Sequence, residues 1–158
     1  MNATHIHLII THLPIFGSIL GSIVLSYGLA TKSTYTQNAS YLVFIISAVG
    51  AGIAYLTGEA AEETVEHIQG VVHDVIESHE ESAKLALISM GILAVFSVVS
   101  LYFNYRKERF AHTLALITLI LSLISFGFSA YTGYLGGKIR HTEIYNSQLP
   151  VSTSEDDD

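Results

Sequence analysis

Residues 83–105, AKLALISMGILAVFSVVSLYFNY, decide the fold of this chain, because they form a long apolar run in which Lys84 is the one charged side chain. A helix of about 20 residues crosses the roughly 30 Å hydrocarbon core of a bilayer. Three further apolar runs of this kind lie at residues 8–30, 41–56 and 112–135. The run at 41–56 needs residues 37–40 to reach full length. The sequence therefore predicts an all-α protein with four membrane-spanning helices.

The composition agrees with a membrane protein and excludes several classes of site. The chain has 158 residues, of which 50% are hydrophobic and 13% are charged, too few charges for an ordinary soluble domain. It has no cysteine, which excludes disulfides, iron–sulfur clusters, thiolate zinc sites and thioether-attached haem. It has no phosphate-binding glycine loop and no basic stripe, so we expect no nucleic-acid partner. Any metal chemistry rests on imidazole, carboxylate or thioether ligands.

The distribution of lysine and arginine predicts the orientation of an up-and-down four-helix bundle. Bases near span ends favour the cytoplasmic side. The connections after the first and third spans carry four bases, Lys32, Arg106, Lys107 and Arg109. The opposite side carries three, Lys84, Lys138 and Arg140. We therefore expect a multi-pass protein of the cytoplasmic (inner) membrane with both termini in the periplasm.

The segment between the second and third spans is predicted to be helical and amphipathic. Its apolar residues recur at three- and four-residue steps, at Ala61, Val65, Ile68, Val72, Val75 and Ile76. We expect a four-helix transmembrane domain over residues 1–141, with this amphipathic segment at 59–80 extending the third helix at the outer face. Residues 142–158 are polar and end in four acidic residues, which predicts a disordered tail.

Histidines are the most informative functional residues of the chain. Alternating spans place seven of the eight at one face of the membrane, namely His5, His7, His12, His67, His73, His79 and His141. Ionisable groups at membrane depth are costly and indicate a functional site by default. The sequence therefore predicts a site at the outer end of the bundle.

His12 and His79 are the predicted pair of ligands within this group. His79 falls in the middle of the apolar stripe, and His12 lies about 10 Å along its helix from the N-terminus. The first and third spans are diagonal neighbours in an up-and-down bundle, so the two rings are expected to face each other as axial haem ligands do. The alternative for His12 is a hydrogen bond to a carbonyl freed by Pro14. The alternative for His79 is an interfacial imidazole paired with Glu80 or water.

The end of the fourth span adds His141 and two bases to the predicted site. Lys138 and Arg140 have the charge to hold the anionic propionates of a haem. The alternative is that they anchor the helix end among lipid headgroups, with their apolar stems in the membrane.

Two rival functions use the same residues differently. In the first, His5, His67 and His73 join Glu59 in a zinc, copper or non-haem iron site without porphyrin. The Glu-x-x-His pairs of four-helix di-iron proteins are absent from the sequence. In the second, the chain is an assembly subunit of a larger membrane complex, such as a respiratory complex, and its histidines are interfacial.

Four short motifs carry a resemblance to a known family. They are HLIITHLPI at residues 7–15, TG at 57–58, His79 before the third span, and GYLGGKIRH at 133–141. They resemble a family of small four-helix bacterial membrane proteins of unassigned function, whose members look like b-type cytochrome bundles and often accompany c-type cytochrome domains. The resemblance implies haem b as the cofactor and His7, His12, His79 and His141 as the positions that bind it.

The expected function is therefore electron transfer by a membrane-bound b-type haem protein at the outer face of the cytoplasmic membrane. A quinone or a periplasmic c-type cytochrome is the expected electron partner.

Overall fold

The computed structural model describes residues 3–65 and 73–140 and confirms the all-α bundle. The helices are α1 (Ala3–Ile10), α2 (His12–Ala30), α3 (Thr34–Leu56), α4 (Gly58–Val65), α5 (His73–Arg106) and α6 (Ala111–Arg140). Four helical stretches are long and apolar enough to cross a membrane, namely Ala3–Ala30, Thr34–Leu56, Asp74–Arg106 and Ala111–Ile139. The protein is a multi-pass membrane bundle.

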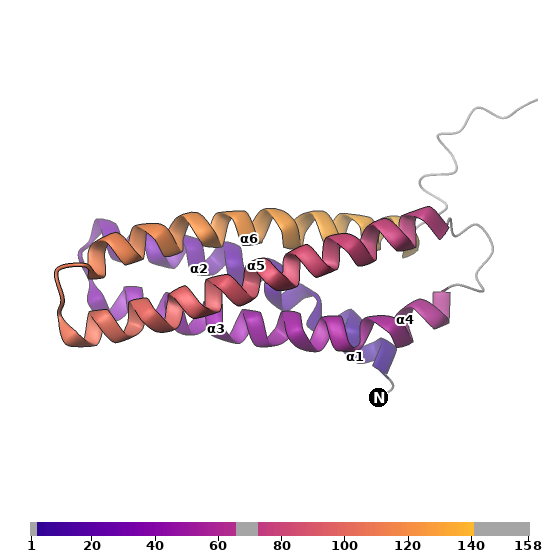
Figure 1. Cartoon of the computed structure of the whole chain (residues 1–158), viewed down its shortest axis with the longest axis horizontal. Coiled ribbons are helices and arrows are strands. Elements are labelled where there is room, and N and C mark those ends of the chain that lie inside the picture. The colour runs from indigo at the N-terminus through magenta and orange to yellow at the C-terminus, as the bar shows by residue number, and fades with distance from the viewer. Residues whose placement is uncertain (1–2, 66–72, 141–158) are drawn as a thin grey trace, which may run out of the picture.

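The four long helices run up and down and pack side by side in a ring (Figure 1). Helix α2 packs on α3 and α6, and α5 packs on α3 and α6, so that α2 and α5 are diagonal. The short helices α1 and α4 pack on each other at one end of the bundle. This end also holds the start of α5 and the end of α6 (Figure 1).

The first span is interrupted at Thr11, three residues before Pro14. Helix α1 ends at Ile10 and α2 begins at His12. Proline has no amide hydrogen to bond the carbonyl four residues earlier, which weakens the helix over this turn. The backbone nevertheless continues in one direction, because the Thr11 amide donates to the His7 carbonyl at 3.0 Å.

The bundle buries many small polar residues beside a hydrophobic core and exposes large apolar side chains, as a lipid solvent allows. Its buried polar residues are mostly hydroxyls, including Ser18, Ser22, Ser47, Ser97, Ser100, Thr118 and Ser122. Large apolar side chains are exposed along every long helix, among them Leu20, Ile23, Ile46, Val49, Ile88, Val95, Ile120 and Leu123. Lipid tails are as apolar as these side chains, so close packing and interhelical hydrogen bonds hold membrane helices together.

Both of these forces are visible at the helix contacts. A β-carbon added to Gly17 on α2 would lie 2.9 Å from Cβ of Ser47 on α3, so only glycine permits this approach. Ser22 on α2 and Ser122 on α6 share a hydrogen bond of 2.6 Å between their hydroxyls. Such bonds contribute on average about 0.6 kcal/mol in a membrane bundle.

At the other end of the bundle, α2 and α5 are each followed by a lysine in the left-handed conformation. Lys32 follows α2 with φ of 53°, and Lys107 follows α5 with φ of 55°. After α5, the Glu108 amide donates to the Phe103 carbonyl at 3.2 Å and the Lys107 amide to the Asn104 carbonyl at 3.1 Å. This is a Schellman motif, which satisfies the carbonyls at a helix C-terminus. The positive side chains also lie at the negative ends of the helix dipoles.

The predicted boundaries are corrected at two places. The second span is longer than expected, because the Ser33 hydroxyl accepts from the Thr36 amide at 3.3 Å and starts α3 at Thr34. Helix α4 covers the start of the predicted segment at 59–80, and α5 covers its end from His73. Residues 66–72, which would join them, lie outside the described residues, as does the predicted tail at 142–158.

A candidate two-histidine site

The end of the bundle that carries α1 and α4 is also the histidine end. His5, His7 and His12 lie in the first span and His79 lies near the start of α5, at the same end (Figure 1). His112 lies near the start of α6 at the opposite end and is exposed. The described histidines therefore gather as the sequence predicts, while His67 and His141 lie outside the described residues.

His79 points into the bundle, as its place in the apolar stripe predicts. The ring is half-buried, and its Nδ1 lies 3.0 Å from the Thr132 carbonyl of α6. Next to this contact, the Ser82 and Thr132 hydroxyls share a hydrogen bond of 2.7 Å. A β-carbon added to Gly136 would lie 3.3 Å from Cε1 of His79. The ring is thus held against α6 by one carbonyl and by the absence of a side chain at Gly136.

His7 is held in the same way against the other half of the bundle. Its ring is half-buried, and its Nδ1 lies 2.8 Å from the Ala54 carbonyl of α3. The Thr57 hydroxyl is 3.4 Å from the same nitrogen. A β-carbon added to Gly58 would lie 3.7 Å from Cε1 of His7.

These contacts determine which nitrogen of each ring carries the hydrogen. A carbonyl oxygen only accepts, so Nδ1 of His7 and Nδ1 of His79 must each donate. In the neutral ring Nε2 then presents a lone pair, and within residues 3–65 and 73–140 neither Nε2 has a hydrogen-bond partner. Metal-bound histidines commonly have this arrangement, in which a backbone carbonyl fixes one nitrogen and the metal takes the other.

The two rings lie at the same end of the bundle, on α1 and α5. His7 is bonded to α3, whereas His79 is bonded to α6. In the first span it is therefore His7, and not His12, whose ring turns toward a neighbouring helix at this end.

The predicted inward orientation of His12 is wrong. His12 is exposed on the outer surface, with its ring stacked on the exposed ring of Phe16 at a centroid distance of 6.3 Å. Its Nδ1 lies 3.0 Å from the Leu8 carbonyl, one turn earlier. A backbone carbonyl thus holds the ring, as in the alternative interpretation, although the carbonyl is not the one that Pro14 frees. His12 and His79 do not face each other.

The spacing of small residues on α2 would have identified His7. The inner face of α2 carries Pro14, Gly21 and Gly28 at seven-residue intervals, all of them buried. Seven residues before Pro14 is His7. Each seven-residue step changes the direction of the side chain by only about 20°, so His7 lies near the same face. His12 lies about 200° from Pro14 and so falls on the outer face. The face of the helix on which a histidine lies therefore predicts its orientation better than its depth in the membrane does.

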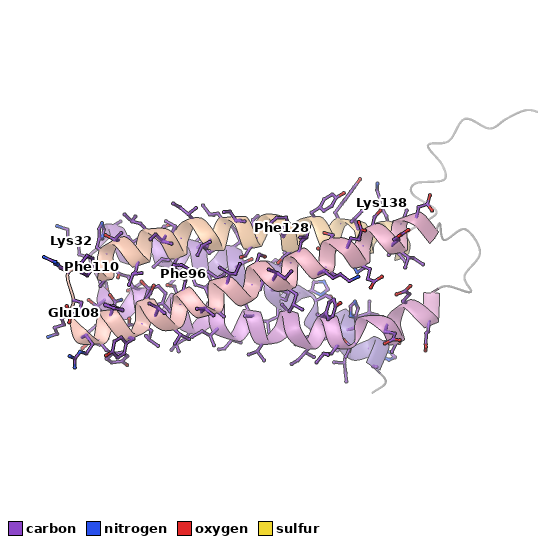
Figure 2. The ribbon with its side chains drawn as sticks, viewed as in Figure 1. Lys32, Phe96, Glu108, Phe110, Phe128 and Lys138 are labelled. Atoms are coloured by element: carbon purple, nitrogen blue, oxygen red, sulfur yellow. The ribbon has the colours of Figure 1, made fainter. Side chains whose placement is uncertain are left out.

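The Lys138 side chain lies on a different side of α6 from the contact with His79. The Lys138 ammonium lies 4.9 Å from the centroid of the exposed Tyr134 ring, at the periphery of the bundle (Figure 2). Lys138 is about 200° around the helix from Gly136, which contacts His79. This position agrees with the alternative role as an anchor in the interfacial region. The side chain of Arg140 is outside the described part of the chain.

The rival site without porphyrin has no complete ligand set in the part of the chain that the structure describes. His5 and Glu59 are both exposed, on α1 and α4 respectively. The side chain of His73 is not described, and His67 lies in the segment between α4 and α5. Over residues 3–65 and 73–140, no three histidine, aspartate or glutamate side chains come together as metal ligands.

The donor set fits haem better than it fits a bare metal ion. A structural zinc ion takes four protein ligands, and a catalytic one takes three. A porphyrin supplies four nitrogens itself, so two axial imidazoles complete the iron. His7 and His79 provide two Nε2 lone pairs from opposite helices, and Gly58 and Gly136 keep the ring edges clear of side chains.

Comparison with known proteins adds no family to this picture. No protein-family model matches the chain, and neither a curated protein nor a solved structure matches it significantly. The resemblance noted from the short motifs stays a prediction.

Proposed function

We propose that the protein is a membrane-bound b-type haem protein for electron transfer, with His7 and His79 as the axial ligands. The observation that carries the proposal is that the two imidazole rings have the same hydrogen-bonding pattern. Each donates Nδ1–H to a carbonyl of a neighbouring helix, and each leaves Nε2 without a hydrogen-bond partner in the described residues. Ionisable side chains within membrane-spanning helices indicate a functional site by default, which favours a group bound at these two nitrogens.

The bound haem would supply one-electron chemistry, and the protein would supply orientation and environment. The carbonyls of Ala54 and Thr132 fix the ring planes and raise the basicity of the two ligand nitrogens. The hydroxyls of Thr57, Ser82 and Thr132 give the site polar walls. A quinone or a periplasmic c-type cytochrome is the proposed electron partner.

We place this site at the outer face of the cytoplasmic membrane. The end of the bundle opposite the histidines carries Lys32 and Glu108, both labelled in Figure 2. The loop around Glu108 also contains Arg106, Lys107 and Arg109. Bases in short loops favour the cytoplasmic side. The acidic residues of α4 and of the start of α5 would then lie outside.

The test is the absorption spectrum of protein purified after expression with adequate haem supply. We expect a Soret band and a pyridine haemochrome of the b type, with the low-spin spectrum of two histidine ligands. His7→Ala and His79→Ala should each lose the haem or convert it to a high-spin form. His12→Ala is the matched control and should leave the spectrum unchanged, because His12 faces outward.

Three outcomes contradict the proposal in different ways. A wild-type protein with no Soret band is not a haem protein. A spectrum that depends on His12 and tolerates His7→Ala returns the ligand role to His12. One tightly held metal by elemental analysis, with a featureless visible spectrum, supports a site without porphyrin.

A further inference from the structure

An apolar recess lies between α5 and α6 at the end of the bundle away from His79. It has a volume of about 280 Å³ and is lined by Val99, Phe103, Phe110, Thr113 and Leu114. Phe110 is 53% exposed and Val99 is 36% exposed, so the recess opens on the outer surface of the bundle. In a membrane this surface faces acyl chains.

Two arginines lie close to the lining residues, at the α5–α6 loop. Arg106 follows Val99 by seven residues and therefore lies within about 20° of it on α5, one turn beyond Phe103. The Arg109 guanidinium carbon lies 4.8 Å from the centroid of the Phe110 ring. Both arginines are exposed. The recess thus has an apolar lining with two cationic side chains close to it.

The loop that follows Arg106 has a fixed shape. The Schellman motif at Lys107 joins the Glu108 amide to the Phe103 carbonyl at 3.2 Å. The Ala111 amide then donates to the Glu108 carbonyl at 3.1 Å at the start of α6. Glu108 is the one acidic residue of the loop, against three bases, and Figure 2 shows it at this end with Phe110. The backbone of the loop is therefore fixed, and the loop carries a net positive charge.

We propose that this recess is a binding site for an anionic glycerophospholipid. The phosphate lies between Arg106 and Arg109, and an acyl chain packs against Val99, Phe103 and Leu114. Charge complementarity decides the occupant, since guanidinium groups bind phosphate oxygens by paired hydrogen bonds. The order of depth also agrees, because the arginines are at the helix ends, whereas Val99 and Phe103 lie one to two turns further into the span.

The experiment measures which lipid the full-length protein retains. The protein is reconstituted into vesicles of equal parts phosphatidylglycerol and phosphatidylcholine, extracted in mild detergent, and analysed by native mass spectrometry. We expect retained phosphatidylglycerol to exceed retained phosphatidylcholine several-fold. Arg106→Gln and Arg109→Gln should each lower this ratio about tenfold, the effect of losing one hydrogen bond to a charged group.

Two matched variants separate the site from general attraction to a charged surface. Lys32→Gln removes one charge from the other loop at the same end and should change the ratio less than twofold. Val99→Phe fills the recess but keeps every charge, and should lower the ratio as the arginine variants do. The proposal is overturned if the wild type shows no preference, if Lys32→Gln acts as strongly as Arg109→Gln, or if Val99→Phe retains the lipid normally.

Discussion

The neighbouring glycines Gly136 and Gly137 offer a sharp test of the site at His79. A β-carbon at Gly136 would lie 3.3 Å from Cε1 and 3.6 Å from Nδ1 of His79, whereas one at Gly137 would meet nothing within 4 Å. Both substitutions to alanine gain the same helix propensity. The difference between Gly136→Ala and Gly137→Ala therefore isolates the contact with the imidazole.

The size of the effect follows from the geometry. Carbon atoms prefer a separation of about 3.5–4.0 Å, so the ring must retreat by a few tenths of an ångström. That movement stretches the bond from Nδ1 to the Thr132 carbonyl beyond its 3.0 Å. A typical hydrogen bond contributes about 1 kcal/mol. Losing most of it weakens haem binding about fivefold through the ligand that this bond positions.

The assay is a haem titration of the apoprotein in detergent, followed at the Soret band. Gly136→Ala should bind haem about fivefold more weakly than Gly137→Ala, and the unfolding midpoint without haem should be lower by about 2–4 °C. The second measurement tests the contact independently of the cofactor. Equal midpoints and equal haem affinities for the two variants would refute the argument that His79 is packed against Gly136.

Two further predictions concern the bundle and its orientation. Gly17→Ala forces its new methyl group against Ser47 and should lower the free energy of unfolding by about 1–3 kcal/mol, measured by denaturation in detergent. Gly52→Ala meets nothing within 4 Å and should be neutral or stabilising by up to about 1 kcal/mol; if the two variants are alike, the close approach of α2 and α3 is wrong. The chain has no cysteine, so a single Lys107→Cys should react with an impermeant maleimide only after cells are permeabilised, whereas Glu59→Cys should react in intact spheroplasts. The reverse pattern would invert the proposed topology.

The sequence was sufficient to predict the fold because the bilayer imposes a simple rule. An apolar run of about 20 residues has to be a helix that satisfies its own backbone, and short connections make neighbouring helices antiparallel. The inward orientation of His79 was also predictable, since its apolar stripe includes Ile76, which is 5% exposed. The start of α3 was not predicted, although Ser33 is the kind of residue that caps a helix.

The choice between His7 and His12 shows the limit of sequence analysis for the site. Both lie at one end of the same span, and depth favours His12. The inner face of α2 is marked mostly by small and hydroxyl residues, so a hydrophobic stripe does not identify it. The buried face of α2 is set by Gly17, Gly21 and Ser18, and this face is continuous with His7. The partner carbonyls of Ala54 and Thr132 depend on the tertiary fold, and no sequence pattern predicts them.

The positions of the two imidazoles indicate that one bound group would link the helices at the outer end of the bundle. The His7 ring is bonded to α3, which packs with α1 and α4, and the His79 ring is bonded to α6, which packs with α5. A ligand shared by both Nε2 atoms would therefore join the two sides of the bundle at its outer end. Deeper in the bundle, hydroxyl pairs such as Ser100 with Thr118 already bridge the helices. We infer that the cofactor's structural role is local to the outer end, so that variants of His7 or His79 should lose the haem while retaining the transmembrane bundle.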